Sequence, residues 1–302
     1  MVAKPQVFVS LSHRVDAWHR ALRLHQWAKN TLVFAPLIAA HHYLDTHAIT
    51  ATILAFVAFS LCASAAYIVN DLCDIEADRL HPRKRHRPFA AGELSVRAGI
   101  TAAVSLLFAA IAIALFLLPL GFTGLLTCYF ILTLWYSLRL KRKAIVDVLS
   151  LAGLYTLRIL AGSAATNISP SFWLLALSMF LFLSLASAKR YVELRGLQQD
   201  GAPVAGRGYT TSDLPLVLAF GVAAGFMAVL VVALYVQSDA ASLYAYPYAL
   251  WVVCPILLYW TSRIWLKAFR GQLHDDPVVF AMTDRPSLIA FVLMLTAVAA
   301  AS

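Results

Sequence analysis

Long apolar stretches alternate with short polar segments along nearly the whole chain. A helix needs about 20 apolar residues to cross the hydrocarbon core of a bilayer, and a somewhat shorter one suffices inside a bundle. The pattern therefore predicts nine membrane-spanning helices, at 30–44, 48–69, 96–118, 121–138, 144–165, 171–189, 213–237, 244–268 and 287–301.

The first 29 residues contain no long apolar run and are not typical of a cleaved signal peptide. Trp18, Leu22 and Trp27 instead predict a helix that lies along the membrane interface before the first span. The expected fold class is all-α. Residues 1–302 should form one integral-membrane domain, a bundle of about nine transmembrane helices, with 1–29 as its cytoplasmic or interfacial N-terminal segment.

Composition agrees with this pattern, since 61% of the 302 residues are hydrophobic and 13% are charged. Soluble domains have about 45–50% apolar and roughly 25% charged residues. A soluble enzyme, a disordered tail and a fibrous protein are therefore excluded. Four cysteines in or beside apolar stretches form no C-x-x-C pair, which predicts free thiols rather than disulfides or a zinc site: Cys62, Cys73, Cys128 and Cys254.

The 24 Lys and Arg residues are distributed unevenly. Only Arg158 lies in the middle of a predicted span, and the others fall at span ends or in alternate connecting segments, at 4–29, 79–97, 139–143, 189–207 and 263–285. Because such residues accumulate on the cytoplasmic side, we expect a cytoplasmic N-terminus, an outer C-terminus and a cytoplasmic active site in a bacterial inner (plasma) membrane. The same bias accounts for the net charge of +9, so no nucleic-acid partner is expected. The expected partners are the lipid membrane and, if copies associate, a second copy of the chain.

The most informative segment is Asn70-Asp71-Leu72-Cys73-Asp74-Ile75-Glu76-Ala77-Asp78. On a helix that continues the second span, Asp71, Asp74 and Asp78 share one face, and so do Asn70, Asp74 and Asp78. Carboxylates brought together there would repel one another unless a cation lay between them, and Mg²⁺ prefers hard oxygen ligands completed by substrate phosphates. The predicted metal ligands are Asn70, Asp71, Asp74 and Asp78, and the three aspartates are the catalytic candidates.

A cluster of cations follows immediately: Arg79, Arg83, Lys84, Arg85 and Arg87. Guanidinium and ammonium groups suit phosphate oxygens. Acids that hold a metal beside bases that hold phosphate predict a diphosphate site. The alternative for the cationic residues is a solvated loop that follows the cytoplasmic charge bias.

These motifs resemble the UbiA superfamily of intramembrane prenyltransferases. The resemblance lies in N-D-x-x-D-x-x-x-D followed by R-x-x-H-P-x-K-x-x-R-P-x-A-x-G, in the run Tyr136 to Asp147, in Leu157 to Gly162 and in the nine-span layout. It implies that Asn70, Asp71, Asp74 and Asp78 hold Mg²⁺ and a diphosphate.

After the sixth span, prenyl-transferring members carry a second aspartate motif, whereas this chain reads Lys189-Arg190-Tyr191-Val192-Glu193-Leu194. That pattern is similar to the branch of decaprenyl-phosphate phosphoribosyltransferases. Arg23 to Asn30 and His274 to Ser287 resemble the same branch. The alternatives are that Trp27 and Lys29 are interfacial anchors, and that Asp275, Asp276, Asp284 and Arg285 form an ordinary paired loop.

The resemblance implies transfer of 5-phosphoribose from 5-phosphoribosyl 1-diphosphate to a polyprenyl phosphate, a step in making a lipid-linked pentose donor for a cell wall. Positioning and charge stabilisation would suffice, with no protein nucleophile. The implied substrate-binding residues are Lys29, Asn70, Arg79, Arg83, Lys84, Arg85, Arg87, Tyr136, Lys141, Asp147, Lys189, Arg190, Tyr191 and Glu193.

Two other functions stay open. The first is transfer of a prenyl group to an aromatic acceptor, as in quinone-type biosynthesis, which the missing second aspartate motif disfavours. The second is a transporter or channel. It would explain the apolar composition and the intramembrane Arg158, but not phased aspartates beside five cations.

Asp147 and Arg158 are separated by three helical turns, about 16 Å, so they share a helix face but cannot pair directly. Asp147 near the cytoplasmic end is expected to reach the site. A charge at membrane depth faces the bundle interior or a polar cavity, so Arg158 should pair with another helix or contact substrate.

Overall fold

The computed structural model describes residues 11–80, 84–198, 207–238, 243–273 and 276–302. Over these ranges the chain is helical and contains no strand. The longer helices are α1 (Leu11–Leu22), α3 (Thr46–Cys73), α5 (Val96–Leu117), α6 (Leu120–Leu138), α7 (Val146–Thr166), α8 (Phe172–Gln198), α9 (Leu214–Val236), α10 (Val253–Phe269) and α12 (Arg285–Ala301). The shorter ones are α2 (Ala35–Ala39), α4 (Ile75–Leu80), α11 (Pro277–Thr283) and the 3-10 segments η1 (Leu24–Phe34), η2 (Lys84–His86), η3 (Leu140–Arg142), η4 (Thr211–Asp213) and η6 (Pro247–Val252).

Seven helical segments of the described chain are long and apolar enough to cross a membrane. They are α3, α5, α6, α7, α8, α9 extended by η4, and α10 extended by η6. Each coincides with one of the predicted spans, which confirms the all-α, multi-span fold class.

Of the nine predicted spans, the first has no counterpart among these helices, and the last is a helix that counts as a crossing only together with its bent neighbour. Residues 30–44 form the end of η1 and the short helix α2, with Pro36 in its first turn, so no long helix is built there. The last span, α12, follows α11 at a bend of 79°, and the two count as at most one further crossing. Asp284 fixes this bend, because it caps α12 by accepting from the Ser287 amide and binds Arg263 of α10 at 2.6 Å.

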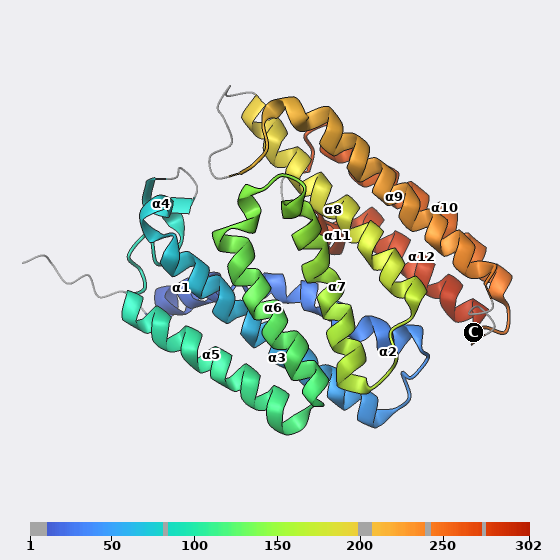
Figure 1. Cartoon of the computed structure of the whole chain (residues 1–302), viewed down its shortest axis with the longest axis horizontal. Helices are drawn as coiled ribbons and strands as arrows, with labels where there is room; N and C mark the ends of the chain where they lie inside the picture. The colour runs from blue at the N-terminus through green and yellow to red at the C-terminus, as the bar shows by residue number, and fades with distance from the viewer. Residues whose placement is uncertain (1–10, 81–83, 199–206, 239–242, 274–275) are drawn as a thin grey trace, which may run out of the picture.

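The spans form two groups that meet at α7. Figure 1 shows α3, α5 and α6 on one side of the bundle and α8, α9 and α10 on the other. Each group has its own apolar core, and α7 supplies Leu154 to one core and Tyr155 to the other. A polar cavity lies between the groups.

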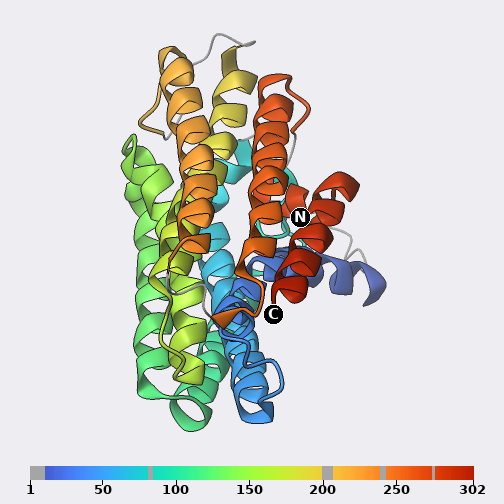
Figure 2. The ribbon, with the colours of Figure 1, turned by 90° about the vertical axis from the view of Figure 1, so that its right-hand side faces the viewer.

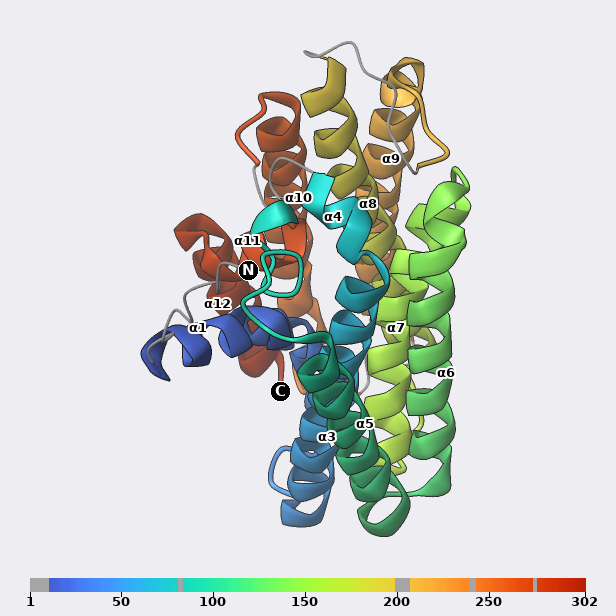
Figure 3. The same cartoon turned by 90° about the vertical axis from the view of Figure 1, so that its left-hand side faces the viewer.

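The N-terminal segment crosses this bundle rather than running along it. Figure 3 shows α1 lying crosswise to α3, as expected of an interfacial helix. Its small residues Ala17 and Ala21 are fully buried against Ile68 and Phe89. The following η1 passes so close to α7 that a Cβ at Gly162 would lie 2.0 Å from the Val33 carbonyl oxygen. Beside α12, the C-terminus lies well away from both long ends of the bundle (Figure 2).

The four cysteines are free thiols, as predicted. Cys62 and Cys254 are buried in the helix packing, and Cys73 and Cys128 are exposed.

Candidate active site

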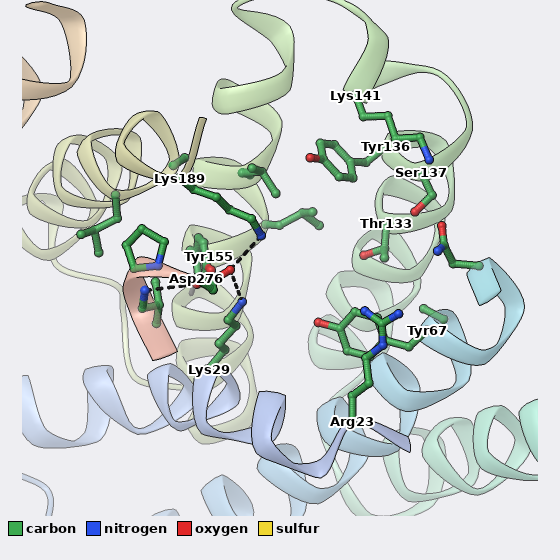
Figure 4. A pocket seen from close by; sticks show the side chains of 18 of the residues that line it. Arg23, Lys29, Tyr67, Thr133, Tyr136, Ser137, Lys141, Tyr155, Lys189 and Asp276 are labelled. Atoms are coloured by element: carbon green, nitrogen blue, oxygen red, sulfur yellow. Dashed lines mark hydrogen bonds and ion pairs between the residues drawn. The ribbon is translucent and has the colours of Figure 1, made fainter. Parts of the chain in front are cut away.

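The polar cavity has a volume of about 360 Å³ and is lined by η1, α3, α6, α7, α8 and the start of α11. Both charged and apolar side chains line it. Figure 4 shows two groups of side chains facing each other across it. Lys29, Lys189, Asp276 and Tyr155 form one group, and the other includes Tyr136, Ser137 and Lys141.

We call the end of the cavity near Lys141 the first end and the end near Lys29 and Lys189 the second end. Asn70 and Asp74 line the cavity at the first end. Helix α3 ends at Cys73, and α4 begins at Ile75 after a one-residue break at Asp74. The Lys141 ammonium lies 3.8 Å from the Asp74 carboxylate. Burial lowers the pKa of Lys141, although the nearby Asp74 opposes this shift. This end therefore presents one carboxylate, one amide oxygen and one ammonium.

The other two aspartates of the motif, Asp71 and Asp78, are not among the residues that line the cavity. The buried Asp71 carboxylate accepts from Arg23 at 2.7 Å and from Arg87 at 3.1 Å. Asp78, also buried, accepts from Arg87 at 2.7 Å. The break at Asp74 takes the motif off a single helix face, and the two arginines neutralise the carboxylates that turn inward. Arg23 and Arg87 themselves line the cavity.

The described residues bring no three His, Cys, Asp or Glu side chains together as a ready-made metal cluster. The donors that line the first end nevertheless fit Mg²⁺. This ion is commonly held by one or two carboxylates and completes its octahedral shell with water and substrate phosphate oxygens. Asp74 and Asn70 are the residues that would hold it.

At the second end, two lysines share one carboxylate oxygen. Lys29 of η1 and Lys189 of α8 donate to Asp276 Oδ2 at 2.7 Å and 2.8 Å. Burial lowers the pKa of Lys29 to about 8, with Asp276 opposing the shift and Lys189 adding to it. Burial alone would raise the pKa of Asp276, but the two ammonium groups outweigh it and hold this pKa well below its usual range. The cluster carries a net positive charge.

Asp147 organises a second charge network beside the cavity. Fully buried at the start of α7, it accepts from the Tyr136 hydroxyl at 2.9 Å and from Arg190 Nε at 2.7 Å. Arg190 also binds Glu193, and Arg207 lies 3.5 Å from both carboxylates. Arg190 is completely buried by these contacts and does not line the cavity, whereas Tyr136, Glu193 and Arg207 do.

Arg158 fills the cavity wall between the two ends. Its guanidinium donates to the Asn30 side chain at 2.8 Å and to the Tyr129 hydroxyl at 3.0 Å. It also lies over the rings of Tyr129 and Tyr155, with centroid distances of 4.8 Å and 5.4 Å. The expected partner on another element is therefore present, and the residue holds η1 and α6 to α7.

The remaining predicted residues divide between the cavity and other places. Lys84 lines the cavity. Arg79 pairs with Glu76, Arg85 is exposed beside His86, and Tyr191 is buried against Trp265 on another face of α8. Arg83 and Asp275 lie outside the described residues.

Several lining residues were not in the predicted site: Arg23, Tyr67, Thr133, Tyr155, Arg207 and Asp276. Arg23 and Asp276 lie within two of the segments that resembled the phosphoribosyl branch, so those segments carried a signal for them. Arg207 reaches the cavity from a connecting segment, and no spacing pattern marks it. Asp284 pairs with Arg263 of α10 rather than with Arg285, so its partner lies outside the loop that the paired-loop alternative described.

The fold and this cavity define a class of protein: a multi-span helical membrane protein with a charged binding site between its helices. The sequence profile of the UbiA prenyltransferase family matches residues 31–283. The chain belongs to this family of membrane-embedded transferases.

Some curated relatives match about nine tenths of the chain, and others match about three fifths of it. The uncharacterized protein y4nM of Sinorhizobium fredii is 42% identical over 91% of this chain, and the chain spans only 54% of its length. Nodulation protein NoeC of Azorhizobium caulinodans is 37% identical, over 89% of this chain and 88% of its own. Decaprenyl-phosphate phosphoribosyltransferase of Mycobacterium tuberculosis is 38% identical, over 61% of this chain and 62% of its own.

Among solved structures, a UbiA homologue from Archaeoglobus fulgidus bound to DMAPP and Mg²⁺ superposes with a TM-score of 0.71. The two sequences are 16% identical, and the match covers 93% of this chain and 99% of that one. The fold is therefore the UbiA fold.

Proposed function

We propose that this chain transfers 5-phosphoribose from 5-phosphoribosyl 1-diphosphate to a polyprenyl phosphate, with Mg²⁺ as cofactor and diphosphate as leaving group. The observation that carries the proposal is the charge arrangement of the cavity. One end offers Asn70 and Asp74, and the other offers Lys29 and Lys189 around a single carboxylate. A second metal cluster needs several carboxylates, whereas two ammonium groups bind a phosphate directly. The partial relatives named decaprenyl-phosphate phosphoribosyltransferase support the same reading.

The residues have distinct tasks in this reaction. Asp74 and Asn70 hold the metal and the donor diphosphate, and Lys141 and Arg87 meet the remaining diphosphate oxygens. Lys29 and Lys189 hold a phosphate monoester at the opposite end, so the reacting groups meet in the cavity between them. Mg²⁺, when bound, supplies positive charge that stabilises the leaving diphosphate. The acceptor phosphate is already an anion, so its oxygen attacks the anomeric carbon, with inversion, without a protein nucleophile or an obligatory base.

The test is a direct comparison of donors. Purified protein with Mg²⁺ is offered labelled 5-phosphoribosyl 1-diphosphate with polyprenyl phosphate, or prenyl diphosphate with an aromatic acid. We expect labelled lipid only with the first pair, and no turnover in excess chelator or in Asp74→Ala. Glu76→Ala is the matched control, because Glu76 is exposed on α4 and pairs only with Arg79 among its described contacts. Product from the second pair alone would contradict the proposal, and full activity in chelator would contradict the metal requirement.

A further inference from the structure

Asp276 occupies an unusual position for a cavity carboxylate, because its two oxygens have different tasks. Oδ2 takes both lysine ammonium groups, from Lys29 and Lys189. Oδ1 caps α11 by accepting from the Val278 amide at 3.1 Å. Figure 4 shows the two lysines converging on this carboxylate from opposite sides. The three residues come from η1, α8 and the start of α11, so one oxygen connects three separate elements.

The positive charge of the two lysines is only partly balanced by Asp276. Two ammonium groups face one carboxylate, and the guanidinium of Arg158 lines the same cavity. Lys29 and Asp276 are almost wholly buried, with side-chain exposures of 8% and 12%, whereas Lys189 is 34% exposed. Buried like charges are costly unless an anion compensates them. A phosphate dianion supplies two charges and three oxygens, more than the single shared carboxylate oxygen does.

We propose that Asp276 is an exchangeable counter-ion, and that the phosphate monoester of a substrate takes the place of its Oδ2 on Lys29 and Lys189. In the empty cavity the carboxylate keeps the two ammonium groups together and directed at the site. When the phosphate enters, its oxygens accept from both lysines, and Asp276 retains only its bond to the α11 amide. Asp276 is thus a positioning residue that competes with the ligand. This inference rests on the proposed function only in that the cavity binds phosphate monoesters.

The exchange and a purely structural role of Asp276 predict opposite changes in phosphate affinity when its charge is removed. If Asp276 competes with the ligand, removing its charge must tighten phosphate binding. If it only anchors the lysines, removing it must loosen them and weaken binding. Asp276→Asn and Asp276→Ser both remove the charge, and both keep a side-chain oxygen that can cap α11, since Asn and Ser are favoured N-cap residues. Either variant suffices if the other fails to fold.

The experiment measures binding rather than turnover, by calorimetric titration of detergent-purified protein in excess EDTA. Two probes distinguish the source of the phosphate: ribose 5-phosphate represents the donor, and farnesyl phosphate represents the lipid acceptor. We expect Kd to fall about tenfold in Asp276→Asn for the probe that binds here, because the two lysine bonds that the phosphate displaces then go to a neutral oxygen and are weaker. Lys29→Met and Lys189→Met should raise the same Kd by about tenfold or more.

Asp284→Asn is the matched control, because Asp284 caps α12 as Asp276 caps α11 but lies outside the cavity lining. It should leave Kd unchanged. A lower Kd in Asp276→Asn for either probe supports the exchange, and the probe that shows it identifies the phosphate that occupies the site. An unchanged or raised Kd in Asp276→Asn for both probes overturns it. Failure of phosphoribosyl transfer in the donor comparison would leave these binding results unaffected, so the two proposals fail separately.

Discussion

A lysine that is buried beside another cation releases its proton more readily than one in water, and Lys29 has such surroundings. The charged groups around it are Asp276 at the start of α11, Lys189 on α8 and Arg158 on α7, with the Tyr155 ring 5.8 Å from its ammonium. Its pKa of about 8 places the loss of its charge just above neutral pH. Below this pH Lys29 is an ammonium and can donate to phosphate; above it the neutral amine contributes little.

Phosphate binding should therefore weaken as the pH rises through about 8. The ligand does not explain the change, since a phosphate monoester is already dianionic there, its second pKa being about 6. We expect Kd for the phosphate monoester to rise roughly tenfold between pH 7 and pH 9, the loss of one charge-assisted bond. Lys29→Arg should abolish this pH dependence, because a guanidinium stays charged. Lys143→Arg, at an exposed lysine outside the cavity, should keep it. A flat wild-type profile would contradict the role of Lys29.

At the scale of secondary-structure elements, the contact between η1 and α7 decides whether the lysine end of the cavity exists. Gly162 lets the η1 backbone approach α7, and one turn earlier Arg158 binds Asn30 of η1. This explains why the run from Leu157 to Gly162 combines an intramembrane arginine with a glycine. The same approach brings Lys29 next to Lys189 and Asp276.

Gly162→Ala should disrupt this contact, because its Cβ would overlap the Val33 carbonyl and η1 would have to move. Overpacking of this kind costs typically 1–3 kcal/mol. We expect a lower melting temperature in detergent and weaker phosphate binding together. Gly153→Ala on the same helix is the control, since no atom lies within 4 Å of the added Cβ. It should be neutral or slightly stabilising. Equal stability of the two variants would show that η1 does not depend on this contact.

For the whole molecule, the absence of Lys and Arg from alternate connecting segments predicts which end of the bundle faces the cytoplasm. The cavity carries Asp74, Lys141 and Lys189 near the basic segments. We therefore expect the substrates to enter from the cytoplasmic side.

Single cysteines at two exposed positions test this orientation. In a background that lacks the four native cysteines, Leu44→Cys should react with an impermeant thiol reagent added outside intact cells. Thr210→Cys, exposed near η4 at the opposite end, should react only after the membrane is permeabilised. Labelling of Thr210→Cys from outside would contradict the predicted topology.

The sequence by itself determined the seven long spans and marked two of the residues that line the first end of the cavity. Span positions follow from local hydropathy, because lipid is the solvent for each helix separately. Asn70 and Asp74 could be found because their spacing is that of one helix face. The two spans that hydropathy did not settle were 30–44, where Pro36 lies in the first turn of a short helix, and 287–301, where the chain bends before α12 and Asp284 at the bend pairs with Arg263 of α10.

Only the tertiary structure decided which charged side chains line the cavity and which form ion pairs with one another. Asp71 and Asp78 pair with Arg23 and Arg87, and Arg190 pairs with Asp147 and Glu193, although their motif positions resemble those of ligand-binding residues. Lys29 meets Asp276 across 247 positions of sequence. No local pattern encodes such a pair, because it depends on how closely η1, α7, α8 and α11 pack, and that packing is a property of the whole bundle.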